Sequence, residues 1–97
     1  MTCMSTHDIV LNIAVNLGRI SRWATEGKQA RVDQFLNETA RYITELEQAP
    51  KSAQFQKTFD SFKKNFYLLK NSSVRDEAWA EAVLAWGNIL THRAKLT

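Results

Sequence analysis

The stretch FQKTFDSFKKNFYLL, residues 55–69, decides the fold class of this chain. Four phenylalanines and a leucine in it recur at steps of four, three, four and three residues: Phe55, Phe59, Phe62, Phe66 and Leu69. At 100° per residue, this spacing puts all five side chains on one narrow seam of an α-helix, which faces a partner helix. The stretch therefore predicts an amphipathic helix over residues 52–70, packed against other helices.

A second apolar stripe precedes this helix near the start of the chain. Ser5, followed three residues later by Asp8, is typical of a helix start, because the serine oxygen accepts a free amide and the carboxylate faces the positive helix end. Gly27 supplies a left-handed stop. We expect a helix over residues 6–25 whose inner face carries Ile9, Ile13, Leu17, Ile20 and Ala24.

Two further stripes complete the pattern. A helix is predicted over residues 29–48 and must end before Pro50, which lacks an amide proton. Asn71 and Ser72 interrupt the phenylalanine helix, and Ser73 with Asp76 repeats the capping pattern, so the last helix is predicted over residues 74–93. The inner faces of these two helices carry Val32, Phe35, Leu36, Ala40, Ile43 and Leu46, and Ala78, Trp79, Ala82, Val83, Trp86, Ile89 and Leu90.

Length and composition fit one helical domain. The chain has 97 residues, of which 44% are hydrophobic and 24% charged, with three glycines and one proline. These values allow a closed core and leave too few chain breakers for a loop-rich sandwich. Four helices of ~30 Å joined by short connections favour antiparallel neighbours. We therefore predict a single all-α domain over residues 1–97, an antiparallel up-down-up-down four-helix bundle.

The N-terminus and the single cysteine indicate a cytoplasmic protein. No lysine or arginine precedes the apolar stretch 9–17, and Asn12 and Asn16 interrupt it, so neither a signal peptide nor a membrane span is expected. Cys3 has no second cysteine with which to form an internal disulfide, which suits a reducing compartment. The net charge of +3 leaves the class of partner open.

Two of the predicted helices carry a second, outward line of small and apolar residues. Each line has a glycine at its third position, and a glycine inside a helix costs ~1 kcal/mol relative to alanine, so close approach of another backbone is the expected reason. We predict that these lines bind a protein partner, most simply a second copy in a homodimer with a two-fold axis; the alternative is that packing between the first and last helices absorbs them. The predicted interface residues are Leu11, Val15, Gly18, Arg22, Ala80, Leu84 and Gly87.

The phenylalanine helix and its flanks carry most of the excess positive charge. Residues 50–75 contain six basic residues and one acid, which gives 6 − 1 = +5, whereas residues 26–49 contain three basic residues and five acids, which gives 3 − 5 = −2. A tyrosine among lysines can stack on an unpaired base while ammonium groups neutralise phosphates. The alternative function is therefore weak binding of a nucleic acid or another anionic partner through Lys63, Lys64, Tyr67, Lys70 and Arg75.

The sequence indicates no catalytic, metal or cofactor site. Ser5, His7 and Asp8 are the residue types of a hydrolytic triad, but neighbouring side chains at a helix start point apart, so capping explains them better. Neither His7 nor His92 has a glutamate three residues ahead, as a di-metal bundle would require. We therefore expect no enzyme.

One buried amide and three indoles leave a ligand role open. Asn16 projects to the edge of the core, where its amide must find a partner in a neighbouring helix or in a ligand. Trp79 and Trp86 are expected in the core and Trp23 at its margin, half exposed.

Overall fold

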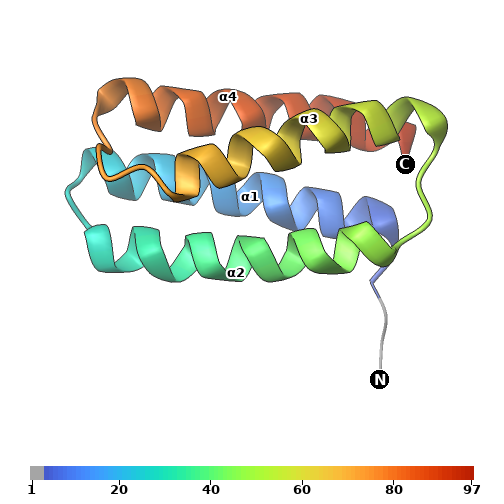
Figure 1. Cartoon of the computed structure of the whole chain (residues 1–97), viewed down its shortest axis with the longest axis horizontal. Helices are drawn as coiled ribbons and strands as arrows, with labels where there is room; N and C mark the ends of the chain where they lie inside the picture. The colour runs from blue at the N-terminus through green and yellow to red at the C-terminus, as the bar shows by residue number, and fades with distance from the viewer. Residues whose placement is uncertain (1–3) are drawn as a thin grey trace.

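The computed structural model describes residues 4–97, so Cys3 lies outside the described part of the chain. It contains four α-helices, α1 (Thr6–Thr25), α2 (Gln29–Gln48), α3 (Ala53–Lys70) and α4 (Glu77–Arg93), followed by a short 3₁₀ helix, η1 (Ala94–Leu96). Consecutive helices run in opposite directions; α1 lies between α2 and α4, and α3 passes in front of α1 and α4 (Figure 1). The predicted all-α bundle is confirmed.

Local signals at the helix ends explain three of the four starts. The Ser5 hydroxyl accepts a hydrogen bond from the Asp8 amide at 3.1 Å, and the Ser52 hydroxyl accepts one from the Phe55 amide at 3.1 Å. Gly27, at φ 74°, follows the end of α1 in the left-handed conformation that favours glycine. The sequence therefore set both ends of α1 and the start of α3 within one residue.

The predicted start of α4 at residue 74 is wrong. The helix begins at Glu77, and its N-cap is Asp76, whose carboxylate accepts the Trp79 amide at 3.0 Å. Ser73 and Val74 belong to the α3–α4 loop. Asp76 is the stronger cap here because its charged oxygen lies at the positive end of the helix dipole.

The closest helix pair is α1 and α4, because small residues line their contact. A Cβ atom placed on Gly87 would lie 3.3 Å from the Ala14 carbonyl oxygen and 3.4 Å from Leu17 Cβ. Two turns away, the buried Ser21 hydroxyl donates to the Ala80 carbonyl oxygen at 2.8 Å. The predicted reason for a glycine in α4, close approach of another backbone, is thus correct for Gly87, and that backbone belongs to the same chain.

Large rings fill the opposite side of the bundle. Phe55, Phe59, Phe62 and Phe66 are all fully buried, which confirms the predicted seam of α3. Trp79 is buried as predicted, and its indole Nε1 donates to the Leu69 carbonyl oxygen at 3.0 Å. The rings separate the α3 backbone from the other helices, so α3 contacts the core mainly through side chains.

The first testable prediction concerns the start of α4. Asp76→Ala should lower the free energy of unfolding by about 1 kcal/mol, because the Trp79 amide loses its cap. Ser73→Ala should change it by less than about 0.5 kcal/mol, since that side chain lies in the loop. Urea unfolding followed by circular dichroism measures both; equal losses in the two variants would contradict the Asp76 cap.

The second prediction separates the two helical glycines. A Cβ on Gly18 would meet no atom within 4 Å, whereas one on Gly87 would press against Ala14 and Leu17. Gly87→Leu should therefore cost about 1–3 kcal/mol of unfolding free energy through overpacking. Gly18→Leu should leave the folded monomer at least as stable as before, because leucine favours a helix more than glycine does. Thermal and urea unfolding at low protein concentration compare the two, and equal destabilisation would refute this difference.

Candidate interaction surface

The predicted interface residues divide into two groups, one facing the core and one facing outward. Three contacts fix which side of α1 meets α4: His7 Nδ1 donates to the Ala94 carbonyl oxygen at 3.0 Å, Ser21 contacts Ala80, and Ala14 lies against Gly87. Ala80 is 2% exposed and Gly87 is also buried. The prediction that these two residues face outward is therefore wrong, because both lie in the α1/α4 contact.

The remaining residues of the two lines lie beside this contact. A step of four residues turns a side chain by about 40° around a helix. Leu11 and Gly18 are one such step from His7 and Ala14, and Leu84 is one step from Ala80. Because α1 and α4 are antiparallel, the same step moves both sets to the same side of the pair. We call this the outer α1/α4 surface, formed by Leu11, Val15, Gly18, Arg22, Leu84 and Thr91.

Apolar side chains are exposed on the outer α1/α4 surface. Val15 is 51% and Leu84 44% exposed, while Leu11 is half-buried against the core. Gly18 is partly accessible, and the space where its side chain would stand is open. The surface thus has two apolar projections and, at Gly18, an open position left by the missing side chain, which we call the depression at Gly18.

This part of the molecule also lacks charge over two helical turns. Residues 9–18 of α1 and residues 82–91 of α4 contain no Asp, Glu, Lys or Arg. The contact between Gly87 and Ala14 places these two stretches side by side. Asp8, Glu81 and Lys95 stand toward the ends of the surface, and Arg19 and Arg22 stand beside Gly18; all five are exposed. Sequence reasoning missed Asp8, Glu81 and Lys95, although Asp8 stands seven residues, or two helical turns, before Val15 and therefore on the same side of α1.

Two of the basic residues predicted to bind an anionic partner are paired with acids of α2. Lys63 forms an ion pair with Glu47, and Arg75 forms one with Asp33. The hydrogen bond from Lys63 to Glu47 raises the pKa of Lys63 above its ordinary value. Arg75 also stacks on Trp79, with the guanidinium carbon 5.6 Å from the ring centroid. Acids of α2 thus neutralise part of the excess positive charge of the α3 region.

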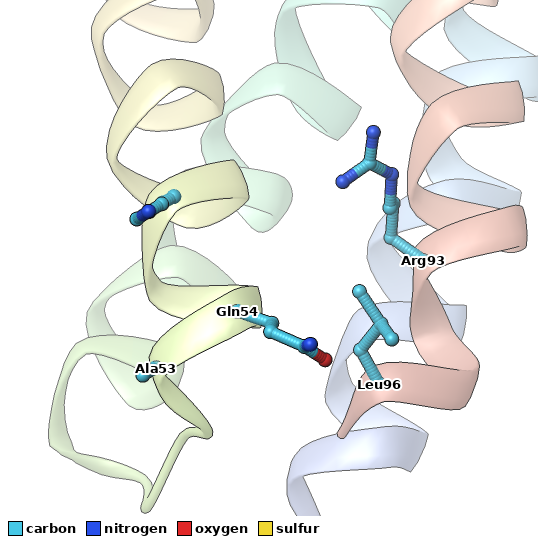
Figure 2. Close-up of a pocket in the computed structure, with 5 residues that line it drawn as sticks. Ala53, Gln54, Arg93 and Leu96 are labelled. Carbon is cyan, nitrogen blue, oxygen red and sulfur yellow. The ribbon is translucent and has the colours of Figure 1, made fainter.

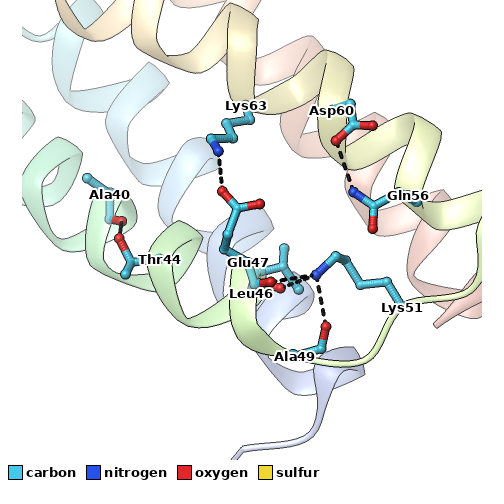
Figure 3. A network of polar contacts seen from close by, with 9 residues as sticks. All are labelled: Ala40, Thr44, Leu46, Glu47, Ala49, Lys51, Gln56, Asp60 and Lys63. Atoms are coloured by element: carbon cyan, nitrogen blue, oxygen red, sulfur yellow. Dashed lines mark hydrogen bonds and ion pairs between the residues drawn. The ribbon is translucent and has the colours of Figure 1, made fainter.

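The other members of the predicted anionic-partner set do not form one exposed stacking site. Lys64 is exposed and Lys70 partly buried, whereas Tyr67 packs against the core and meets Phe66 edge to face at 5.3 Å between ring centroids. Figure 3 shows how Lys63 reaches across to Glu47 on α2. In the same view Lys51 donates to backbone carbonyl oxygens at the end of α2, including that of Ala49 at 2.8 Å.

A shallow cleft of about 400 Å³ opens between the start of α3 and the end of α4 (Figure 2). Ala53, Gln54, Lys57, Arg93 and Leu96 line it. Arg93 donates to the Thr58 hydroxyl at 3.4 Å, so its guanidinium is directed toward α3. The lining therefore combines two apolar side chains, one amide and the two cations Lys57 and Arg93.

The residues for which the sequence left a ligand role open have partners within the fold. The amide of Asn16 is buried and donates to the Thr39 hydroxyl of α2 at 3.4 Å. Trp23 is half-buried, as predicted, with its ring edge on Phe35 at 4.7 Å between centroids. Trp86, which the sequence placed in the core, is only half-buried and packs against Phe62 at 5.6 Å between ring centroids. Each of these side chains contributes to packing between helices.

The N-terminal serine, histidine and aspartate do not form a triad. Ser5 caps α1 through the Asp8 amide, and His7 binds the far end of the chain, where its Nδ1 also lies 3.3 Å from the Thr97 hydroxyl. Within residues 4–97, no three side chains of histidine, cysteine, aspartate or glutamate gather as a metal site would require. No helix in that range is long and apolar enough to cross a membrane.

Comparison of the chain with protein-family models, with curated proteins and with solved structures finds no match.

The third prediction tests whether the α2 acids mask the basic residues. Asp33→Asn combined with Glu47→Gln should free Arg75 and Lys63, so this variant should elute from a heparin column at higher salt than the unmodified chain. Glu38→Gln combined with Glu45→Gln changes the net charge equally, but these acids form no ion pair within residues 4–97. Elution of both double variants at the same salt would show that net charge alone controls retention.

Proposed function

We propose that this chain is a small non-enzymatic interaction module that binds a second copy of itself through the outer α1/α4 surface. The observation that carries the proposal is the side-by-side placement of two uncharged helical stretches that expose Val15 and Leu84. Burying apolar side chains releases ~25 cal/mol per Å² of area, so an uncharged surface with exposed apolar groups favours association. A surface without charge at its centre also avoids the cost of burying unpaired ions.

The size of the surface fits a reversible dimer. Two helices of this length cover an area of ~30 Å by ~20 Å, or ~600 Å² on each copy. A dimer would then bury ~1,200 Å² in total, which is the lower limit for specific, stable interfaces. We therefore expect association that depends on protein concentration in the micromolar range, rather than an obligate dimer. The buried core of each copy, with four fully buried phenylalanines, supports a monomer that is folded by itself.

Self-association would also cover part of the exposed apolar surface of α4. Leu84, Ala85 and Ile89 are exposed in a helix whose other face is already buried against α1 and α3. A helix that carries apolar residues on more than one face is typical of a buried position. A second copy on the outer α1/α4 surface would cover Leu84, so that α4 would be buried on a further face.

The fourth prediction tests this surface directly. Val15→Glu and Leu84→Lys should each shift the monomer–dimer equilibrium strongly toward monomer, because each would bury an unpaired charge in the contact. Both positions are about half exposed, so the helical content should be retained. Sedimentation equilibrium over a wide concentration range measures the mass.

Leu68→Glu is the matched control. Leu68 is 66% exposed on α3, outside the outer α1/α4 surface, so this variant should associate as the unmodified chain does. A mass that stays monomeric at high concentration for the unmodified chain would refute the proposed self-association. Loss of association in the Leu68 variant alone would place the contact on α3.

A further inference from the structure

We infer that the second copy binds with its α4 on α1 of the first, about a two-fold axis parallel to the helices, so that Leu84 of each copy enters the depression at Gly18 of the other. This inference rests on the self-association proposed above and names the residues that meet in it. A two-fold axis makes the contact occur twice, once on each side. The inference follows from which residues of α1 and α4 lie at the same level along the bundle axis within one copy. We call this level the height of a residue.

Contacts within one copy fix these heights. Gly87 lies beside Ala14, Leu17 and Gly18, and Ala80 lies beside Ser21. Leu84 stands between Ala80 and Gly87, and its height is therefore that of α1 between Gly18 and Ser21. A two-fold axis parallel to the helices exchanges α1 with α4 and leaves every height unchanged. Leu84 of one copy then faces the other copy's α1 next to Gly18.

The shape of the surface at this height favours that arrangement. Leu84 projects from α4, 44% exposed, and a side chain at Gly18 would meet nothing within 4 Å. A large side chain entering a space between neighbouring residues of a facing helix is the usual packing of paired helices. The hole in this case lies among Val15, Gly18, Arg19 and Arg22, and Gly18 forms its floor. The arrangement also gives a use to a glycine that internal packing does not require.

Charges at both ends of the surface are complementary in the same arrangement. Glu81 is three residues before Leu84, and its height matches that of Arg22, so Arg22 of one copy faces Glu81 of the other. At the opposite end, Asp8 and Lys95 lie at matching heights, because His7 contacts Ala94. All four side chains are exposed. Among residues 4–97, Arg22 forms an ion pair with Glu26 alone, at 3.7 Å on the surface, a contact that contributes little.

The test exchanges the charges at one of these contacts. Arg22→Glu and Glu81→Arg, each alone, should weaken self-association about tenfold, because a like-charge pair then occurs on both sides of the axis. An equimolar mixture should form heterodimers with an affinity close to that of the unmodified chain. In the heterodimer one side pairs the two substituted residues and the other pairs the two original ones. Native mass spectrometry separates the heterodimer from both homodimers by mass.

A steric variant and a charge control complete the experiment. Gly18→Leu fills the depression and should reduce association at least tenfold while the monomer keeps its fold, which circular dichroism checks. Arg41→Glu, an equal charge change on an exposed arginine of α2, should not alter association. Val15→Glu serves as the reference for loss of the whole surface.

The outcomes separate this inference from the proposed function. Preferential heterodimers together with the effect of Gly18→Leu support the inferred arrangement. If the unmodified chain dimerises and Val15→Glu prevents it, but Gly18→Leu and the charge exchange have no effect, the arrangement is wrong and self-association stands. If the unmodified chain stays monomeric at all concentrations, both are refuted.

Discussion

The close approach of α1 and α4 is the constraint on which the rest of the structure depends. Gly87 has no side chain where the Ala14 carbonyl and Leu17 Cβ stand 3.3 and 3.4 Å from the position of a Cβ atom. Because these backbones lie so close, the Ser21 hydroxyl can reach the Ala80 carbonyl oxygen. The same contact orients both helices and thereby determines which of their residues face inward and which remain at the surface.

The two halves of the core are packed with side chains of different size. Where α1 meets α4, small residues bring the two backbones together. Where α3 covers the bundle, four buried phenylalanines fill the space between its backbone and the other helices. Polar contacts also connect α3 to its neighbours. Lys63 pairs with Glu47 of α2, and the Trp79 indole of α4 donates to the Leu69 carbonyl oxygen. A protein of this size needs both, because a thin helical bundle has few positions that are buried from every side.

Charge and apolar surface are segregated in the fold in a way that bears on function. The excess positive charge of the α3 region is partly neutralised by acids of α2. Most of the charged residues of α1 and α4 stand near the helix ends, where acids at the start and bases at the finish also stabilise the helix dipoles. The centre of the α1/α4 layer is left uncharged. The proposed self-association makes use of that centre, and the charges at its ends restrict the ways in which two copies can meet.

Periodic apolar spacing in the sequence determined the four helices, because a helix repeats every 3.6 residues and a one-sided core requires exactly that repeat of large side chains. The predicted cap at Ser5 is correct, and the structure adds an unpredicted cap at Ser52. Ser73 misled because a competing cap, Asp76, stands three residues later. The sequence by itself also showed that α1 and α4 carry a second line of small and apolar residues. Which members of those lines face water depended on how the two helices rotate against each other. Only the tertiary structure decided that rotation: it buried Ala80 and Gly87 in the contact, left Gly18 open, and kept Val15 and Leu84 at the surface. The physical reason is that a glycine in a helical sequence looks the same whether it lies in a helix contact, as Gly87 does, or at the surface, as Gly18 does. The two cases differ only in whether another backbone packs against the glycine.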